Sequence, residues 1–259
     1  MAAVLHGKKC FIFDQDGTVY LGDKPIRKTV DFIISNWDRY SFRFLSNNTS
    51  KTPDMYVEKL RNMGIPAGPE DILTPIVPLA RYLESSGIQC VYPVGNRVFT
   101  EYLLDLCPWL TLSSKDAEAV ILAYDTELTY EKLRESCLLL QYDEVRFLAT
   151  HPDFVCPSPE GPLPDIGSFI RLYEAATGRS PDVIFGKPSP ELLEPLLADF
   201  SKNEMVMAGD RLMTDKILAE NFGIEFVLVL SGEAKREDCI GLQRQPDHIV
   251  EDFGEVLAD

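Results

Sequence analysis

The sequence predicts an α/β protein built on a mostly parallel sheet. Short apolar runs alternate with amphipathic segments along the 259 residues, and strands that alternate with helices favour parallel α/β units. The composition, 45% hydrophobic and 25% charged residues, is that of an ordinary soluble globular protein. A chain of this length can form one large domain or two smaller ones, each with a real core.

The apolar runs predict the strands, and the segments between them predict the helices. We expect strands at 10–13, 42–45, 120–123, 147–149, 183–185, 205–208 and 226–230. The clearest helical patterns span 29–37, 53–63, 129–140, 190–200 and 214–222. Gly64 and Gly223 occur where two of these helices should end.

Charge and cysteine content narrow the functional classes. A formal charge of -16, from 41 acidic and 25 basic residues, argues against nucleic-acid binding, which needs clustered lysine and arginine. The six cysteines form no CxxC pair, which favours a reducing compartment. Because no apolar run reaches the ~20 residues of a membrane span, and residues 1–9 lack a signal-peptide pattern, we expect a cytoplasmic protein without membrane contact.

The strongest chemical signal is the string FIFDQDGT at residues 11–18. A predicted strand runs directly into Asp14 and Asp16, and Gly17 permits the sharp turn that must follow. The carboxyl ends of parallel strands are where ligands bind in such sheets. Two carboxylates placed there can divide the work of nucleophile and proton donor.

Three further strands end in polar residues. Residues 42–50, FRFLSNNTS, supply Ser46, Asn47 and Asn48, which suit phosphate oxygens. Residues 185–190, FGKPSP, place Lys187 between a strand and a helix start, where its ammonium could neutralise phosphate.

The last of these strands runs into MAGDRLMTD at residues 207–215, which supplies Asp210 and Asp215. Carboxylates that converge on one site repel one another. A hard divalent cation relieves that repulsion, and Mg²⁺ fits best because it binds through carboxylates, waters and phosphate.

The order of these motifs resembles the haloacid dehalogenase superfamily, and more narrowly its NagD and p-nitrophenylphosphatase-like branch. The motifs D-x-D-G-T, S-N-N, G-K-P and G-D-R-L-x-T-D carry the resemblance, together with ATHPD at 149–153 and LVLSG at 228–232. It covers nearly the whole chain, from Lys9 to Ile249. It implies a Rossmann-like core with a mostly parallel sheet and an inserted α/β cap: core at 1–79, cap at 80–181 and core again at 182–259.

The resemblance also implies roles. Asp14 is expected to be the nucleophile and a metal ligand, and Asp16 the general acid and base that also offers a backbone carbonyl to the metal. Lys187 is expected to bridge phosphate and nucleophile. The expected metal is Mg²⁺, with Asp210 as a ligand and Asp215 supporting its water shell. Phosphate oxygens would be held by three residues of the second motif: Ser46, Asn47 and Asn48.

Substrate choice is expected to lie in the cap, mainly at 150–168, because the core motifs are used for phosphate, metal and proton transfer. His151 and Asp165 are candidate substrate contacts there, although a hydrogen-bonded structural role is the more ordinary one for His151. Relatives more often have a small residue at the position of Asp165, which makes their substrates unsafe to carry over.

The expected activity is magnesium-dependent hydrolysis of a small phosphorylated metabolite. Sugar phosphates, phosphoglycolate, pyridoxal phosphate and nucleotides remain open as substrates, and a homodimer through the cap is one possible assembly. Two alternatives remain: a phosphotransferase or mutase that uses the same aspartyl-phosphate, and a non-catalytic phospholigand-binding protein. The intact pair of Asp14 and Asp16 weighs against the second.

Overall fold

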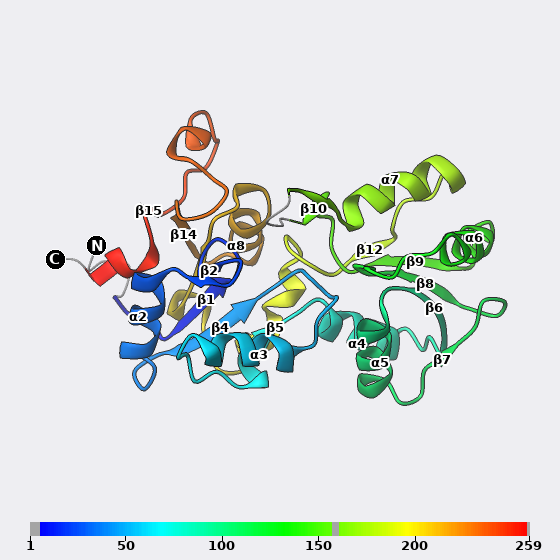
Figure 1. Cartoon of the computed structure of the whole chain (residues 1–259), viewed down its shortest axis with the longest axis horizontal. Coiled ribbons are helices and arrows are strands. Elements are labelled where there is room, and N and C mark those ends of the chain that lie inside the picture. Colours follow the sequence, from blue (N-terminus) through cyan, green and yellow to red (C-terminus); the bar gives the residue numbers. More distant parts are fainter. Residues whose placement is uncertain (1–5, 157–160, 258–259) are drawn as a thin grey trace. The chain divides into compact units, whose positions relative to one another are not determined.

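A computed structural model describes residues 6–156 and 161–257 (Figure 1). Across these residues the chain divides into two compact units. Unit 1 comprises Met1–Ser46, Pro53–Leu73 and Lys187–Asp259, and unit 2 comprises Asn47–Thr52 and Thr74–Gly186. The chain therefore leaves unit 1, builds unit 2 and returns, which is the pattern of an inserted domain.

Unit 1 contains a parallel sheet, six-stranded in the described residues, and this confirms the α/β class. In sheet order its strands are β15 (His248–Val250), β14 (Glu225–Val229), β13 (Met205–Gly209), β1 (Cys10–Asp14), β4 (Ser41–Leu45) and β5 (Ile72–Leu73). A short antiparallel hairpin, β2 (Tyr20–Leu21) with β3 (Lys24–Pro25), follows β1. Because β1 lies between β13 and β4, the loops that follow these three strands gather at one edge of the sheet.

Helical segments connect the strands of unit 1. The α-helices are α2 (Arg27–Ser35), α3 (Pro53–Asn62) and α8 (Ile217–Phe222). The 3-10 turns are η1 (Pro69–Asp71), η2 (Pro190–Leu192), η3 (Glu194–Ala198), η4 (Lys202–Glu204), η6 (Arg236–Cys239) and η7 (Phe253–Leu257), and η5 (Leu212–Lys216) is a π-helical turn that leads into α8. None of the helices in the described residues has the length and apolar character needed to cross a membrane.

The predicted helix at 190–200 is wrong, because this stretch forms the short turns η2 and η3 instead. Pro195 explains the difference. Proline has no backbone N–H and its ring clashes with the carbonyl of the residue four positions earlier, so a regular helix cannot pass through it.

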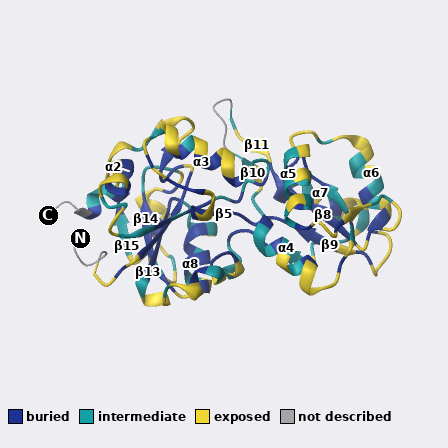
Figure 2. Cartoon of the chain, turned by 90° about the horizontal axis from the view of Figure 1, so that it is seen from below, coloured by how far each residue is buried: buried dark blue, intermediate teal, exposed yellow. Residues whose placement is uncertain are grey.

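Strand β1 shows why the apolar runs of this chain are continuous rather than alternating. Phe11 and Phe13 point into the core on one face of the sheet, and Cys10 and Ile12 into the core on the other. All four side chains are at most 1% exposed. Helices cover both faces of a parallel sheet, so its central strands are apolar on both sides. Figure 2 shows β13 and β14, two further strands of this sheet, coloured mostly as buried.

Unit 2 has its own parallel sheet, five-stranded in the described residues, in the order β12 (Val183–Ile184), β9 (Arg146–Ala149), β8 (Ala119–Leu122), β6 (Cys90–Val94) and β7 (Thr111–Leu112). Its helices are α4 (Ile76–Ser85), α5 (Arg97–Leu106), α6 (Tyr130–Leu139) and α7 (Ile166–Thr177). A hairpin of β10 (Val155–Cys156) and β11 (Leu163–Pro164) precedes α7.

The longer segment of unit 2 runs from Thr74 to Gly186, whereas the predicted cap spans 80–181. Helix α4 begins before residue 80, and its buried Ile76 and Leu79 pack in the same core cluster as Phe99 of α5. At the other end, β12 pairs with β9 inside the sheet of unit 2. Both elements therefore belong to the inserted unit.

Candidate active site

Acidic side chains meet at the carboxyl edge of the sheet in unit 1. Asp14 is the last residue of β1, and Asp210 directly follows β13, the strand paired with it. Asp215 follows within η5. One carboxylate oxygen from each of these three residues lies within 4.8 Å of the others, and all three side chains are buried. Parallel pairing thus brings together acids about 200 residues apart in the sequence.

Lys187 compensates part of this negative charge. It is 3% exposed, and its ammonium donates hydrogen bonds to Oδ1 of Asp14 and, at 2.7 Å, to Oδ1 of Asp215. Three carboxylates and one ammonium leave two negative charges in this cluster if every group is ionised. That excess matches the charge of a divalent cation.

The ionisation of the cluster reflects its burial. Burial raises the pKa of Asp210, and the carboxylates of Asp14 and Asp215 raise it further. The pKa of Asp215 is also raised, mainly by burial and despite Lys187 beside it. Burial lowers the pKa of Lys187, but the nearby Asp14 and Asp215 outweigh this and raise it overall. Without a cation, therefore, the lysine stays charged while Asp210 and Asp215 resist ionisation.

The two carboxylate oxygens of Asp210 differ in their hydrogen bonding. Its Oδ2 accepts a hydrogen bond from the backbone N–H of Glu233 at 2.7 Å. Its Oδ1 is buried and has no hydrogen-bond partner in the described part of the chain. A buried carboxylate oxygen without a partner is costly, and oxygen ligands at an acidic site suit a hard divalent cation. The donor set therefore fits a metal such as Mg²⁺.

The other motif residues of unit 1 lie at the same edge. Asp16 is exposed, two residues beyond Asp14, and Gly17 makes the turn after it with a φ of +90°. Ser46 follows β4, and Leu45, the residue before it, pairs with Asp14. The Ser46 hydroxyl donates to the hydroxyl of Tyr56 at 3.0 Å, a contact that no local sequence pattern predicts.

Asn47 and Asn48 lie in the short segment that belongs to unit 2. The amide of the buried Asn47 donates to Oδ2 of Asp153 at 3.0 Å. Oδ1 of Asn48 accepts from the backbone N–H and the hydroxyl of Ser50. Asn47 is therefore joined to the loop that follows β9, which contains Asp153.

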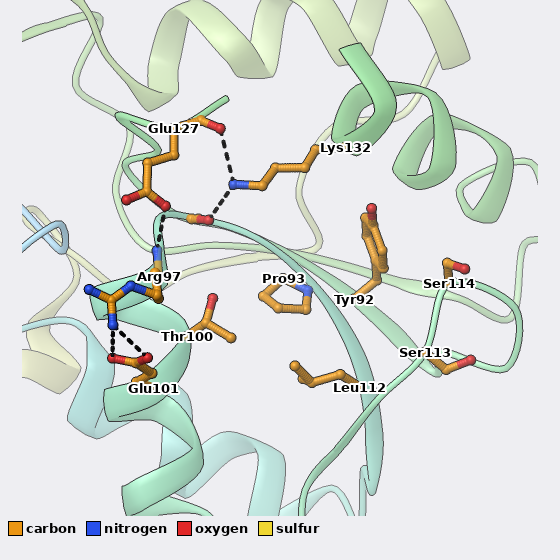
Figure 3. A pocket seen from close by; sticks show the side chains of 11 residues that line it. Tyr92, Pro93, Arg97, Thr100, Glu101, Leu112, Ser113, Ser114, Glu127 and Lys132 are labelled. Carbon is orange, nitrogen blue, oxygen red and sulfur yellow. Dashed lines mark hydrogen bonds and ion pairs between the residues drawn. The ribbon is translucent and has the colours of Figure 1, made fainter. Parts of the chain in front are cut away.

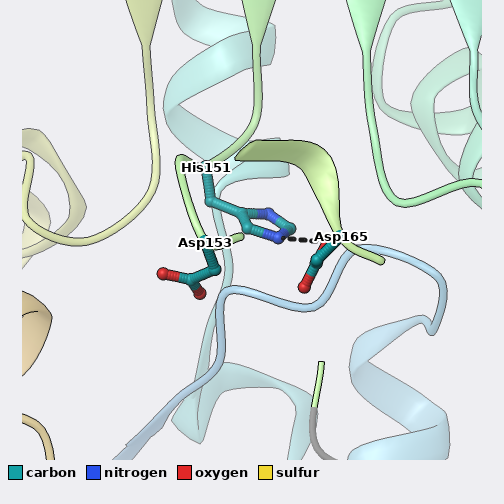
Figure 4. A group of neighbouring side chains, drawn as sticks. All are labelled: His151, Asp153 and Asp165. Carbon is teal, nitrogen blue, oxygen red and sulfur yellow. Dashed lines mark hydrogen bonds and ion pairs between the residues drawn. The ribbon is translucent and has the colours of Figure 1, made fainter. Parts of the chain in front are cut away.

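His151 and Asp165 form a buried pair in unit 2 (Figure 4). They are 0% and 4% exposed, and Nε2 of His151 lies 2.9 Å from Oδ1 of Asp165. Nδ1 of His151 lies 3.3 Å from the hydroxyl of Thr150, and the same Oδ1 of Asp165 accepts from the backbone N–H of Ile166 at the start of α7. The pair thus ties the loop after β9 to α7.

Unit 2 also contains a pocket of about 490 Å³ between β6, α5 and the segment after β7 (Figure 3). Two of its positive side chains are already paired: Arg97 with Glu101 at 2.9 Å and Lys132 with Asp125 at 2.7 Å. The carboxylate of Glu127, another lining residue, accepts a hydrogen bond from the backbone N–H of Arg97. Phosphate would have to compete with these carboxylates, so the pocket is a weak candidate for a phosphate site.

Comparison with known proteins gives concordant results. Residues 11–106 match the family model described as haloacid dehalogenase-like hydrolase, and residues 184–256 match one described as HAD-hydrolase-like. A 5'-nucleotidase of Bacillus subtilis (strain 168) is 30% identical, with 96% of this chain and 97% of the relative covered. An acid sugar phosphatase of Staphylococcus aureus (strain USA300) is 31% identical, with 97% of each covered.

Among solved structures, a 4-nitrophenylphosphatase from Thermotoga maritima superposes with a TM-score of 0.91 at 36% identity, covering 99% of this chain and 98% of that one. Fold, motif order and sequence identity agree over essentially the full length. The chain belongs to the haloacid dehalogenase-like hydrolases, in the branch that includes NagD and the p-nitrophenylphosphatases.

Proposed function

We propose that this chain is a magnesium-dependent phosphatase that hydrolyses a small phosphorylated metabolite through an aspartyl-phosphate on Asp14. The observation that carries the proposal is the buried cluster of Asp14, Asp210 and Asp215, whose negative charge Lys187 offsets only in part. The phosphatase names of relatives over the full length support the same reaction.

In the first half-reaction a carboxylate oxygen of Asp14 bonds to phosphorus, and the bond from phosphorus to the leaving oxygen breaks. Asp16, protonated at this stage, gives its proton to the leaving alkoxide. The exposure of Asp16 supports this role, because a proton donor must reach the leaving group. Lys187 stabilises the charge that develops on the phosphoryl oxygens.

In the second half-reaction Asp16, now a carboxylate, takes a proton from water. The water oxygen bonds to phosphorus, the bond to Asp14 breaks, and inorganic phosphate leaves. Mg²⁺, when bound, would neutralise phosphoryl charge and orient the phosphate against Asp14. We assign its ligands to Asp14, Asp210 and the backbone carbonyl of Asp16, with Asp215 supporting its waters. Ser46, Asn47 and Asn48 would hold the remaining phosphate oxygens.

Substrate selection is proposed to lie in unit 2, in the segment 150–168, of which residues 157–160 lie outside the described residues. Exposed apolar side chains on the β10–β11 hairpin and directly before it support this: Phe154, Val155 and Leu163 are 44–53% exposed. Direct contact of His151 and Asp165 with substrate stays a prediction. Their burial and their mutual hydrogen bond support an indirect role in substrate selection, in which they hold the β10–β11 hairpin in place.

An activity screen of the purified protein tests the proposal. Phosphate release should be measured with Mg²⁺ against sugar phosphates, phosphoglycolate, pyridoxal phosphate, nucleotides and an aryl phosphate. We expect turnover that stops with EDTA and returns with excess Mg²⁺. Undiminished turnover in excess chelator would reject the metal, and binding without turnover on the whole panel would favour a phospholigand-binding protein. Transfer to an added sugar phosphate in place of water would favour a mutase.

A further inference from the structure

We propose that the loop Ser231–Glu233 is a positioning element of the active site, which holds the carboxylate of Asp210 so that Oδ1 alone is presented to the metal. The proposal rests on the metal site of the proposed function and adds a part of the chain that the catalytic motifs do not include. The loop follows β14, which pairs with β13 at Gly209↔Leu228, so it lies beside the residue that follows β13.

Two backbone N–H groups, one in this loop and one in Ala234 directly after it, donate hydrogen bonds to Asp210. The N–H of Glu233 donates to Oδ2 of Asp210 at 2.7 Å, and the N–H of Ala234 donates to the backbone carbonyl of Asp210 at 3.0 Å. Both the side chain and the main chain of Asp210 are thereby fixed to one short segment. With Oδ2 occupied, Oδ1 is left buried and without a partner in the described residues.

Glycine is required on both sides of this carboxylate for space. A Cβ at Gly232 would lie 2.0 Å from Oδ2 of Asp210, and a Cβ at Gly17 would lie 2.3 Å from the same atom. Gly232 is not among the glycines with positive φ, so the constraint on it is steric and not conformational. Any side chain at this position would push either the loop or the carboxylate away.

Ser231 connects this loop to the turn that follows β1. Its hydroxyl donates to the backbone carbonyl of Gly17 at 2.7 Å, and Gly17 belongs to the turn that follows Asp14 and Asp16. The loop therefore links the two places that supply the expected metal ligands, one after β1 and one after β13. Such outer contacts fix the orientation of a ligand and tune its affinity for metal.

The Glu233 side chain has little part in this. It pairs with Arg211 at 3.1 Å, but its side chain is 66% exposed, and exposed ion pairs contribute little. The backbone N–H of residue 233 makes the contact with Asp210. Replacing the Glu233 side chain keeps the backbone N–H, so this substitution separates the contribution of the side chain from that of the backbone hydrogen bond.

The test measures Mg²⁺ affinity without substrate, by calorimetric titration of the full chain and by the Mg²⁺-induced rise in Tm. Gly232→Ala should weaken Mg²⁺ binding about 10–100-fold, the usual cost of losing an outer-shell support. Ser231→Ala should weaken it about fivefold, the scale of one lost hydrogen bond, and Ser231→Thr should restore it. Glu233→Ala and the neighbouring Lys235→Ala should stay within about twofold of the wild type.

Circular dichroism of each metal-free variant shows whether the fold is kept. If the wild type binds Mg²⁺ and folded Gly232→Ala binds it equally well, the loop has no positioning role. If Gly232→Ala does not fold, the serine pair decides: equal affinities for Ser231→Ala and Ser231→Thr reject the proposal. If the wild type itself binds no Mg²⁺, the metal assignment of the proposed function fails, and this inference fails with it.

Discussion

Two clusters of metal-ligand-type side chains in this protein differ in how their polar atoms are satisfied. In unit 1 the buried Asp14, Asp210 and Asp215 each place a carboxylate oxygen within 4.8 Å of the others, and in unit 2 one ligand atom each of His151, Asp153 and Asp165 lies equally close, with Asp153 only partly buried. In unit 1, Oδ1 of Asp210 has no partner in the described residues.

In unit 2 the close groups have other partners. His151 is bonded through both ring nitrogens, and Asp165 is bonded to His151 and to the start of α7. Asp153 accepts from Asn47. Proximity of ligand-type atoms is therefore a weaker sign of a metal site than uncompensated charge and an unpaired buried oxygen. Substitutions in the two clusters test this distinction.

The largest effect is expected at the proposed nucleophile, Asp14. Asp14→Asn should abolish measurable turnover while leaving the fold intact, because the amide has nearly the same shape but is a poor nucleophile. Asp16→Asn should lose about 10²–10⁴-fold in kcat, the range of general acid–base catalysis. Steady-state kinetics and circular dichroism are the measurements, and a well-folded Asp14→Asn enzyme with substantial activity would require another nucleophile.

The second prediction concerns metal stoichiometry. We expect one Mg²⁺ per chain, lost in Asp210→Asn and kept in Asp153→Asn, because the cluster in unit 2 is satisfied by hydrogen bonds. Calorimetric titration of both variants gives the count. Loss of the ion in Asp153→Asn with full binding in Asp210→Asn would reverse the assignment of the two clusters.

The third prediction concerns pH. The pKa values of Asp210 and Asp215 are raised, mainly by burial, so the metal-free folded protein binds protons more tightly than the unfolded chain. Its free energy of unfolding therefore falls as pH rises from about 4, where aspartate ordinarily titrates, through the raised values. Mg²⁺ competes with these protons, so its stabilising effect should be larger near pH 8 than near pH 5.

Thermal melts with and without Mg²⁺ at several pH values measure this trend. Asp210→Asn is the control, because it removes a group with a raised pKa and should flatten the dependence. A Mg²⁺-induced rise in Tm that is the same at all pH values would contradict the raised pKa values.

The smallest effect is expected in the satisfied cluster. Asp165→Ala leaves His151 and the backbone N–H of Ile166 without their buried acceptor, so unfolding should become easier by about 1–3 kcal/mol. Asp165→Asn keeps one oxygen acceptor and should lose less. Denaturant titration measures this, and equal stability of Asp165→Ala and the wild type would show that the pair does not support the fold.

The kinetics of the same variants address substrate choice. If the pair holds the β10–β11 hairpin, kcat/KM for the best natural substrate should fall more in Asp165→Ala than kcat/KM for a small aryl phosphate. Equal losses on both substrates would place the effect in the catalytic core or the fold.

The four central strands of the sheet in unit 1 were predicted from their apolar runs, and β1 is apolar on both faces, with Phe11 on one and Ile12 on the other. The short edge strands β5 and β15 were not predicted. Strand β6 of unit 2 was not predicted because it contains Pro93, and proline normally argues against a strand inside a sheet. The helix expected at 190–200 failed at Pro195 for the related reason that proline interrupts a helix. Apolar runs predicted strands reliably where the run was buried and contained no proline.

Asp14 and Asp210 were predictable because the first ends an apolar strand and the second directly follows one. Their environment was not. The space beside Asp210 depends on Gly17 and Gly232, which are far apart in the sequence. The string LVLSG at 228–232 supported the family resemblance but indicated no role for its residues. The His151–Asp165 bond likewise joins residues 14 positions apart through burial that no local pattern reveals.

Trapping the phosphoryl group on the enzyme tests the central claim most directly. A crystal structure with Mg²⁺ and beryllium fluoride, a mimic of a bound phosphoryl group, should show beryllium bonded to a carboxylate oxygen of Asp14. Mg²⁺ should lie against Asp14 and Asp210, with Lys187 contacting the fluorides. Beryllium fluoride on any other side chain, or Mg²⁺ in the cluster of His151, Asp153 and Asp165 with the cluster of unit 1 empty, would contradict the account.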